Sequence, residues 1–472
     1  MTSLWRRTAR PEPGRRESAS LRSGSIIPAV SSPRAVLRLR ELVAHTAYIL
    51  AAQTLYWVAV GWRRALLRTT FIAVTGTHGK TTTKEMLAAI LGSSWPTFRT
   101  ASNENTGLPL TLNILRVRPW QRFAVVEIGV GAPGEMRRLA RLVRPDVAVM
   151  LTVLRTHTKA FGDQERHARE KAVLLRALRP GGLAVINADD PLAAGMAEVV
   201  RCRVVRSGTC PGFDVWAEGA TSRWPGRLEF DVRTRDGEFC HARTRLVGTH
   251  WCTSAIAALA TARALGVPLP DAVAALAAVE PFQGRMQPML LPSGAVVLRD
   301  DYDGSIDAFE AGLRVLAEAR AARRIAVIAD ASDYGSTVRR KRVGHLGRES
   351  ARVADVVVFV GQAAEHGRRG ALAAGVAPEN VHAFRTLPEA ANFLHDTLKC
   401  GDLVLLKGRV SDHLARVFFA QLGPVRCQLA QCEKRILCDE CADLGIAPDQ
   451  RNRAMIAPVE RATSEGLGLP AS

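Results

Sequence analysis

The sequence is poor in aromatic residues, and its mean hydropathy is close to zero. Phe, Trp and Tyr make up 6% of the 472 residues, and no stretch alternates basic with aromatic side chains. Proteins that bind single-stranded nucleic acids commonly stack the bases on such side chains, so this scarcity argues against that class. A mean hydropathy of +0.02 excludes a protein built from many membrane spans. The 47% hydrophobic and 23% charged residues indicate a globular chain with a core, and they exclude global disorder and a collagen-like fibre.

Lysine is also scarce, although basic charge is abundant. The 64 Lys and Arg residues against 45 Asp and Glu residues give a formal net charge of +19, and only eight of the 64 are Lys. Residues 1–40 alone hold nine Arg and two Glu. We interpret the excess as an Arg-rich composition plus a basic N-terminal arm, and we favour this interpretation over nucleic-acid binding. Contact of this basic arm with an anionic membrane surface is an alternative explanation for part of the charge.

One apolar segment follows the arm. Residues 42–62 carry no formal charge, and 21 residues are long enough to cross a bilayer. Polar residues interrupt the segment, so we favour a helix that packs on the next domain or lies at a membrane interface over a true span. These polar residues are His45, Thr46, Gln53 and Thr54.

From Phe71 onward, short β-like runs alternate with helical patterns. This alternation predicts an α/β fold built on mostly parallel, doubly wound sheets. Residues 200–247 predict shorter strands at a sheet edge, and a second α/β series starts near Gly284. The predicted strands are Phe71–Thr75, Ala124–Ile128, Val147–Leu151, Leu183–Asn187, Ala295–Leu298, Ile325–Ile328, Val356–Val360 and Leu403–Leu406. The predicted helices are Thr82–Leu91, Glu165–Leu178, Trp251–Leu265, Asp271–Val279, Ala308–Ala319, Val343–Val353 and Leu387–Leu398.

The strongest local signal is a Gly-rich turn, G-x-x-G-K-T, between a predicted strand and a predicted helix. Gly76 and Gly79 let backbone N–H groups approach phosphate oxygens, Lys80 adds a positive charge, and Thr81 offers a hydroxyl to Mg²⁺. The turn is a compact variant of the Walker A loop. An ordinary tight turn would explain the glycines but not the Lys-Thr pair, so we predict phosphate binding.

The turn resembles that of the Mur ligase superfamily, and further motifs of that superfamily follow in order over about residues 70–422. The most similar branch is that of the UDP-N-acetylmuramoyl-tripeptide–D-alanyl-D-alanine ligases. One such motif is weak evidence, whereas this many in the same order are strong. The matching segments are Gly76 to Thr82, Ser102 to Pro109, Val125 to Gly129, Arg144 to Ala148, Thr156 to His157, Phe161 to Gly162, Lys171, Gly248 to His250, Gly284 to Met286, Asp300 to Tyr302 and Leu406 to Gly408.

The resemblance implies a P-loop central domain followed by a Rossmann-like C-terminal domain. It also implies formation of an amide bond from a carboxylate and an amine, with ATP converting the carboxylate into an acyl phosphate. The residues implied in catalysis are Lys80, His157, Lys171 and Arg285. The residues implied at the nucleotide are Gly76, Thr77, His78, Gly79, Lys80, Thr81, Thr82, Ser254, Arg285 and Asp301. The residues implied at Mg²⁺ are Thr81, Glu127, His157 and a carbamylated Lys171.

The expected domain organisation has five parts. They are a disordered basic arm (1–35), an apolar or amphipathic helix (36–68), an ATP-binding central domain (69–282), a C-terminal α/β ligase domain (283–425) and a tail with a cysteine cluster (426–472). The first two parts are too short for the UDP-binding N-terminal domain of the branch, so we expect that domain to be lacking. The sequence also departs from the branch at Thr152, Ser254, Asp303, Arg409 and Val410. These changes fall mainly on nucleotide-base and substrate positions, so the substrates stay open.

Nine cysteines occur, and four of them cluster as Cys427-x4-Cys432-x5-Cys438-x2-Cys441. Four thiolates are enough to enclose one Zn²⁺ tetrahedrally, and an x2 pair is typical of a zinc knuckle. The x4 and x5 spacings are unusual. We predict a structural zinc, and the alternatives are free thiols or, in a secreted protein, disulfides.

The sequence therefore predicts an ATP- and Mg²⁺-dependent carbon–nitrogen ligase. Its partners would be a carboxylate substrate and an amino acid, a dipeptide or another amine. One alternative is a Mur-like amidating subunit that acts on a cell-wall precursor with a glutaminase partner. Another is a non-catalytic Mur-like scaffold that binds nucleotide or membrane. We expect a cytoplasmic protein, with the N-terminal helix as a candidate contact to the membrane surface.

Overall fold

The computed structural model describes residues 33–101, 104–154, 161–331, 336–429 and 436–446, together with Cys432 and Lys434. The chain divides into two compact units, Met1–Thr54 and Leu55–Ser472. Both sheets belong to the second unit.

Helix α1 (Pro33–Ala65) contains the apolar segment predicted from the sequence. Its residues 44–54, in the first unit, are largely exposed. In the second unit Tyr56, Ala59 and Val60 are buried, at the three- and four-residue spacing of one helical face. Among the described helices, none combines the length and the hydropathy that crossing a bilayer requires.

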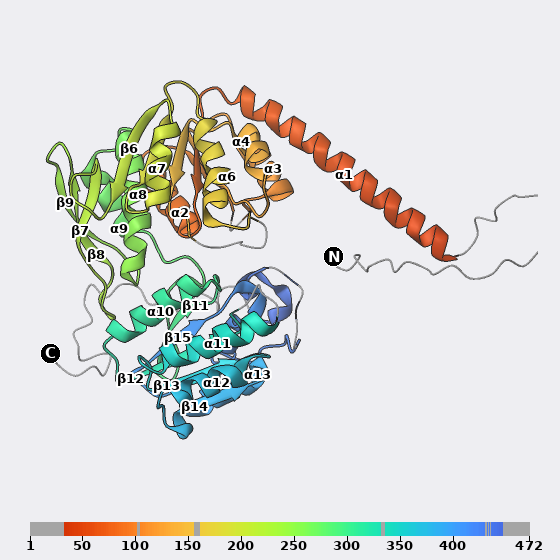
Figure 1. Ribbon diagram of the computed structural model, residues 1–472, viewed down its shortest axis with the longest axis vertical. Coiled ribbons are helices and arrows are strands. Elements are labelled where there is room, and N and C mark those ends of the chain that lie inside the picture. Colours follow the sequence, from red (N-terminus) through yellow and green to blue (C-terminus); the bar gives the residue numbers. More distant parts are fainter. Residues whose placement is uncertain are drawn as a thin grey trace, which may run out of the picture. The chain divides into compact units, whose positions relative to one another are not determined.

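The first sheet has nine strands among the described residues, in the order β2-β3-β1-β4-β5-β6-β7-β8-β9. Figure 1 labels β6 to β9, which lie toward one edge of this sheet. Strands β2 to β7 pair in parallel, and β7, β8 and β9 pair antiparallel at the edge. The strands are β1 (Thr70–Thr75), β2 (Thr97–Arg99), β3 (Phe123–Glu127), β4 (Val147–Met150), β5 (Leu183–Asn187), β6 (Arg203–Gly208), β7 (Val215–Thr221), β8 (Glu229–Thr234) and β9 (Phe239–Arg243).

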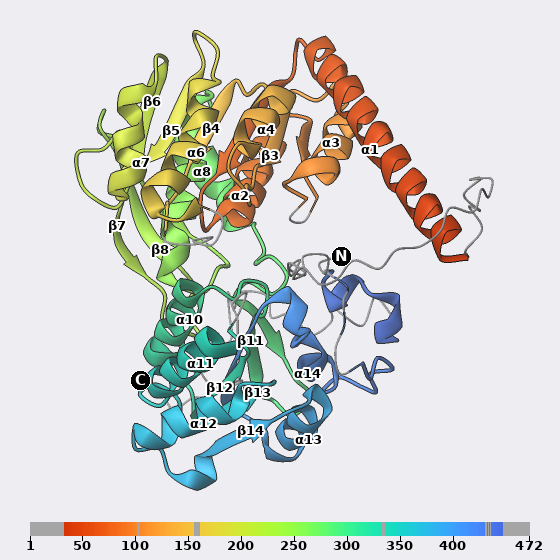
Figure 2. The same cartoon turned by 45° about the vertical axis from the view of Figure 1, so that its right-hand side comes forward.

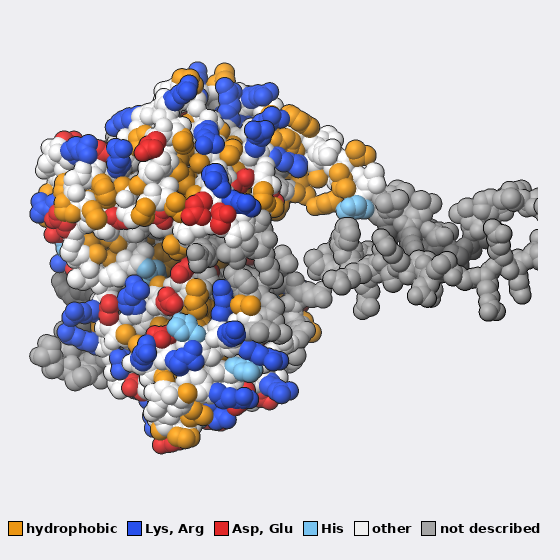
Figure 3. All heavy atoms as spheres, viewed as in Figure 1, with side chains coloured by type: hydrophobic (Ala, Val, Ile, Leu, Met, Phe, Trp, Pro, Cys, Tyr) orange, Lys and Arg blue, Asp and Glu red, His pale blue; other side chains and the backbone are white. Residues whose placement is uncertain are grey.

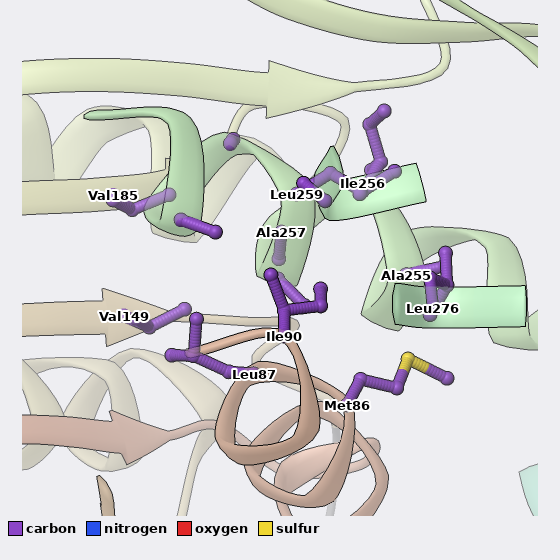
Figure 4. Close-up of a cluster of buried hydrophobic side chains, with 14 of the residues drawn as sticks. Met86, Leu87, Ile90, Val149, Val185, Ala255, Ile256, Ala257, Leu259 and Leu276 are labelled. Atoms are coloured by element: carbon purple, nitrogen blue, oxygen red, sulfur yellow. The ribbon is translucent and has the colours of Figure 1, made fainter. Parts of the chain in front are cut away.

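Helices cover both faces of this sheet, because its central strands alternate apolar side chains toward each face. On one face Ile72, Val74 and Val149 pack against helices α2 (Lys80–Gly92), α8 (Cys252–Ala264) and α9 (Leu269–Ala277). Figure 4 shows this cluster, in which Leu87 and Ile90 of α2 lie near Ala257 of α8. The opposite face packs against α1 and four further helices. They are α3 (Gly107–Arg116), α4 (Glu135–Val143), α6 (Gln164–Arg176) and α7 (Pro191–Gly195).

The second sheet has six strands among the described residues, in the order β10-β11-β15-β12-β13-β14. All neighbours are parallel except β10 and β11. One face packs against α10 to α12, and the other against α13 and α14 (Figure 2). The elements are β10 (Gln287–Leu290), β11 (Val296–Asp300), α10 (Ile306–Glu318), β12 (Arg323–Ala329), α11 (Ser336–Ser350), β13 (Val356–Val360), α12 (Ala364–Ala373), β14 (Val381–Phe384), α13 (Leu387–Thr397), β15 (Asp402–Lys407) and α14 (Ala415–Phe419).

The predicted α/β fold class is confirmed, with two mostly parallel sheets. Each predicted strand coincides with an observed one to within two residues at either end. Helix α11 begins at Ser336, seven residues before the predicted start at Val343. The sequence did not predict its first turns because they are rich in charge and show no apolar period. On the face drawn in Figure 3, the described Lys and Arg side chains are scattered among apolar and acidic ones.

Candidate active site

The carboxyl ends of three neighbouring central strands, β3, β1 and β4, lie together at one end of the first sheet. Val74 of β1 lies beside Glu127 of β3, and Thr75 of β1 lies beside Met150 of β4. Strand β1 therefore has neighbours on both sides that come later in the sequence. Ligands of open α/β sheets bind at such an end, where the strand order reverses. The residues that follow β1, β3 and β4 form the candidate site.

Two glycines shape the loop that follows β1. Gly79 has a left-handed backbone with φ of +78°, and a Cβ there would lie 2.5 Å from Ser254 Oγ. A Cβ on Gly76 would lie 2.7 Å from Leu151 Cβ. Helix α2 begins directly after the loop, at Lys80, so its free backbone N–H groups face the loop. The close packing and the helix start together make a cradle for an anion such as phosphate.

Two amines, of the half-buried Lys80 and the buried Lys171, donate to carbonyl oxygens of this loop. Lys80 Nζ donates to the Thr77 oxygen at 2.8 Å, and Lys171 Nζ of α6 donates to the Gly76 oxygen at 3.0 Å. Burial lowers the pKa of Lys80. Burial, together with the nearby charge of Lys80, holds the pKa of Lys171 well below its ordinary value. A buried amine that loses its proton readily is a nucleophile, which is what carbamylation by CO₂ requires.

A buried carboxylate lies beside the same loop. Glu127 is 1% exposed and accepts hydrogen bonds from Thr81 Oγ1 at 2.8 Å and from Asn105 Nδ2 at 2.7 Å. The Glu127 N–H donates to Thr100 Oγ1 at 3.1 Å. A hydroxyl and a carboxylate side by side are hard oxygen donors of the kind that bind Mg²⁺ next to phosphates. The donor set therefore fits a magnesium ion.

An arginine from the segment before the second sheet reaches the same point. Arg285 Nη2 lies 3.4 Å from Thr81 Oγ1, and the Arg285 guanidinium lies 4.2 Å from the centre of the Tyr302 ring. The backbone turns sharply at Gly284, where φ is +67°, and the Tyr302 N–H donates to the Gly284 oxygen at 3.2 Å. Burial raises the pKa of Tyr302, so its hydroxyl stays neutral beside the guanidinium.

A histidine of the loop pairs with two carboxylates that follow β11. His78 Nδ1 lies 3.0 Å from Asp303 Oδ2, and His78 Nε2 lies 3.7 Å from Asp307 Oδ2. Burial disfavours the imidazolium, but the hydrogen bond to Asp303 and the nearby Asp307 carboxylate outweigh burial and raise the pKa of His78. Burial would likewise raise the pKa of Asp303, but the hydrogen bond to His78 and the charges of His78 and Lys407 hold it well below its ordinary value.

Comparison with known proteins agrees with this geometry. The family model of the Mur ligase middle domain matches residues 74–262, and that of the Mur ligase glutamate ligase domain matches residues 284–410. The chain is 30% identical over 423 residues to the UDP-N-acetylmuramoyl-tripeptide–D-alanyl-D-alanine ligase of Mycobacterium bovis, covering 85% of this chain and 83% of the relative. The chain belongs to the Mur ligase family.

Solved Mur ligases have the same fold. MurF from Acinetobacter baumannii superimposes with a TM-score of 0.72 at 28% identity, covering 78% of this chain and 80% of that one. MurF from Thermotoga maritima in complex with ADP gives a TM-score of 0.67, covering 78% of this chain and 83% of that one, and its 24% identity supports the fold alone. The predicted family and ligase class are confirmed, and the chain is an ATP-dependent ligase that forms amide bonds.

In this Mur ligase, most of the residues predicted at the nucleotide lie together. The loop from Gly76 to Thr82 adjoins Ser254, which is 4% exposed near the start of α8, and Arg285. The Thr82 hydroxyl is buried without a hydrogen-bond partner among the described residues, and so it is free to bond to a ligand. His157, predicted as a metal ligand, lies outside the described residues.

Asp301 and the four clustered cysteines belong to the part of the chain that is built on the second sheet. Asp301 is 3% exposed and is 3.2 Å from Arg299. Burial raises the pKa of Asp301. Cys427, Cys432, Cys438 and Cys441 line one small cavity and form no disulfides. In the described part of the chain, no three His, Cys, Asp or Glu side chains are already arranged as a metal-binding group.

Three residues of this region were not predicted from the sequence. Asn105, the partner of Glu127, comes from a loop whose motif was noted without a role for its amide. Lys407 Nζ is 2.9 Å from Asp300 Oδ2 and donates to the Asp303 oxygen at 2.5 Å, so it ties the end of β15 to the segment after β11. Asp439 pairs with Arg299 across 140 residues of sequence. Only the noted motifs around the first two gave a signal, and no local pattern pointed to Asp439.

Proposed function

We propose that this ligase adds a dipeptide of the D-alanyl-D-alanine type to the terminal carboxylate of a UDP-linked muramoyl tripeptide. The proposal extends to this chain what the names of the relatives from Mycobacterium bovis and Acinetobacter baumannii say of those proteins. In this reaction ATP phosphorylates the carboxylate, the amine attacks the acyl phosphate, and phosphate leaves with the formation of the amide bond.

One observation supports the chemistry more than any other. The phosphate loop, the Thr81–Glu127 pair and the Arg285 guanidinium converge on Thr81 Oγ1, with contacts of 2.8 Å and 3.4 Å. Phosphoryl transfer needs positioning and neutralisation of charge around the moving phosphoryl group, and these groups supply both. In this proposal Lys80 leaves the Thr77 carbonyl for the phosphates, and Arg285 stabilises the charge that develops during transfer.

We include two metals in the proposal. Mg²⁺ would be held by Thr81 and Glu127 with His157 and a carbamylated Lys171, and it would neutralise phosphate charge when bound. The depressed pKa of Lys171 supports carbamylation, since CO₂ reacts with the neutral amine. A structural Zn²⁺ would be held by the cysteines at 427, 432, 438 and 441. The dependence on ATP favours a reaction in the cytoplasm, and the first half of α1 is a candidate for contact with the membrane surface.

The test is the release of ADP in the presence of UDP-N-acetylmuramoyl-tripeptide and D-alanyl-D-alanine, with the product identified by mass. Lys80→Ala should lower turnover by about a thousandfold, because the phosphates lose their buried cation. Lys399→Ala is the matched control, since Lys399 is exposed and far along the sequence from the loop, and it should leave turnover unchanged.

Different outcomes overturn different parts of the proposal. ADP release that needs ammonia or glutamine instead of the dipeptide would replace it with the amidating function. ADP release with other carboxylates or amines only would overturn the peptidoglycan substrates and keep the ligase chemistry. Full activity of Lys80→Ala would overturn the role of the phosphate loop.

A further inference from the structure

The C-terminal segment gathers four cysteines and one histidine around a single cavity. The cavity measures about 10 Å³ and is lined by Cys427, Cys432, Cys438, Cys441 and His413. That volume holds about one small ion or one water molecule. Cys427 and Cys432 come from different parts of an irregular segment and Cys438 and Cys441 from one turn, yet all four line the same cavity and none forms a disulfide. Scattered structural thiols have no reason to converge in this way.

Polar groups surround three of the sulfur atoms. Cys438 Sγ lies 3.4 Å from His413 Nδ1, and Cys427 Sγ lies 3.6 Å from Arg416 Nη1. Cys441 Sγ lies 3.8 Å from Lys434 Nζ. N–H donors of this kind hold metal-bound sulfurs in place. The surroundings of these three sulfur atoms therefore suit ligands of a metal ion.

The last two cysteines lie on a turn that suits a shared metal. Residues Cys438–Glu440 form a short 3-10 helix, and the Cys441 N–H donates to the Cys438 oxygen at 3.1 Å. Both cysteines line the same cavity, and their x2 spacing is that of a zinc knuckle. Four soft sulfur ligands in a closed, tetrahedral arrangement select Zn²⁺ over Mg²⁺ or Ca²⁺. The described His, Cys, Asp and Glu side chains are not already arranged as a metal-binding group, so binding would have to move the four sulfurs to the Zn–S distance of about 2.3 Å.

The same turn carries the carboxylate that pairs with a buried arginine. Asp439 Oδ1 is 2.6 Å from Arg299 Nη1, and Asp439 Oδ2 is 2.9 Å from Arg299 Nη2, a bidentate pair. Arg299 is 1% exposed and its Nη2 also lies 3.2 Å from Asp301 Oδ2. Asp301 precedes Tyr302, whose ring lies under the Arg285 guanidinium. The turn from Cys438 to Cys441 is therefore connected, through the buried Asp439–Arg299–Asp301 ion pairs, to the part of the site that holds Tyr302 and Arg285.

We propose that Cys427, Cys432, Cys438 and Cys441 bind one Zn²⁺ and that the zinc-bound turn holds Asp439 against Arg299, which positions the Asp301–Tyr302 segment. Binding forms four Zn–S bonds and releases the four thiol protons to solvent. Asp439 is a positioning residue in this inference, because it acts on the site through Arg299. The inference rests on the zinc part of the proposed function and is independent of the ligase substrates.

The experiment measures metal and backbone protection in the full chain, purified under reducing conditions without added metal. We expect about one zinc per chain by mass spectrometry of the elements. Refolding or exchange with Co²⁺ should give the strong visible absorption of tetrahedral cobalt with thiolate ligands. Cys438→Ser combined with Cys441→Ser should lose the metal, whereas Cys210→Ser, at an exposed cysteine outside the cluster, should keep it.

The positioning role is tested by hydrogen exchange at the amides of residues 299–302. Removal of zinc from the unmodified chain with a thiol reagent should speed this exchange. Asp439→Asn should speed it too while keeping the zinc, and Asp439→Glu should partly restore protection. Unchanged exchange after zinc removal would overturn the positioning role.

The metal site itself fails if the purified chain holds no zinc and Co²⁺ gives no thiolate absorption. It also fails if a mass decrease under non-reducing conditions shows disulfides among the four cysteines. These readouts need no substrate, so they stand or fall separately from the ligase assay. If zinc is present and ADP release is absent, the proposed reaction is wrong and the metal site remains.

Discussion

At the scale of single residues, the phosphate loop depends on close approach between backbone and neighbours. The contact between Gly79 and Ser254 leaves no room for a side chain, and the left-handed backbone at Gly79 disfavours any residue with a Cβ. Ser254 stands where the related branch usually has Asn, so the loop and α8 meet through a small side chain in this Mur ligase. The geometry of the anion cradle is therefore sensitive to one methyl group.

Gly79→Ala should abolish measurable ATP binding while the chain stays folded. The new Cβ would displace the Ser254 hydroxyl or open the loop, and either change moves the N–H groups that receive phosphate. Isothermal titration with ATP and Mg²⁺ checks this. Gly181→Ala is the control, because Gly181 has the same φ of +78° but open space around it. It should cost about 1–2 kcal/mol of stability and leave ATP binding unchanged.

The pair of His78 and Asp303 should make stability depend on pH. The raised pKa of His78 means that its stabilisation is complete below about pH 6.5 and is lost as the pH rises through the raised value. The lowered pKa of Asp303 keeps that carboxylate charged over the same range. His78→Gln should therefore lower the melting temperature at about pH 6 and have little effect at about pH 9.

Melting curves at several pH values check the pair, with His395→Gln as the control at an exposed histidine. A difference between the unmodified chain and His78→Gln that stays constant with pH would contradict the ion pair. A difference that grows with pH would reverse the predicted sign.

At the scale of elements, the strands were predictable and several helices were not. Strands of a parallel sheet are buried on both faces, so runs such as Val356–Val360 are continuously apolar and visible in the sequence. Short edge strands such as β2 and β14 have only three and four residues, each with a polar side chain among them, and are too short for such a run. Helix α4 was not predicted although it has a buried apolar face, because it is only nine residues long and arginines interrupt its apolar residues.

The site could be predicted as far as its residues lie in local motifs. Lys80, Thr81 and Glu127 were predicted from a turn and a strand end, and the structure brings them together. Partners that come from distant segments, such as Asn105 for Glu127 and Asp439 for Arg299, have no local pattern. Such pairs are set by the packing of whole elements, which a single sequence does not display.

A buried arginine is one of the residues that anchor the end of helix α1. Arg63 is 6% exposed and donates to the Val143 and Arg144 oxygens at 2.7 Å each, and it is 3.1 Å from Asp146. Its guanidinium also lies 3.8 Å from the centre of the ring of Phe71, the second residue of β1. The helix end is thus fixed to the loop between α4 and β4 by charge-assisted hydrogen bonds.

Arg63→Ala should lower the free energy of unfolding by about 2–4 kcal/mol, because buried carbonyls and part of Asp146 lose their donor. Chemical denaturation followed by circular dichroism measures the change. Arg64→Ala, at the exposed neighbour, should change it by less than about 0.5 kcal/mol. Equal effects of the two substitutions would show that the contacts of Arg63 contribute nothing specific.

At the scale of the whole molecule, the second unit includes part of a helix that no motif assigned to the catalytic domains. Tyr56, Ala59, Val60 and Leu66 belong to the same buried cluster as Phe71 and Ala73 of β1. A chain that begins at Leu55 should therefore keep the stability and ATP turnover of the full chain. A chain that begins at Thr69 should melt about 5–10 °C lower, because these side chains no longer cover the sheet.

Differential scanning calorimetry of the two shortened chains checks this prediction, with ADP release as a second readout. Equal melting temperatures would show that the second half of α1 contributes nothing to the fold. Loss of stability in the chain that begins at Leu55 would place the critical residues in the first unit instead.

The burial of α1 and of the cysteine turn has a practical consequence for recombinant work. The family models start at residue 74 and stop at residue 410, whereas Tyr56 and Val60 at one end and Cys438, Leu444 and Ile446 at the other complete the two hydrophobic clusters. A fragment cut at the homology limits would expose apolar surface at both ends and would tend to aggregate during expression. Soluble material for crystallisation or inhibitor screening calls for gene fragments that run from about codon 55 to beyond codon 446.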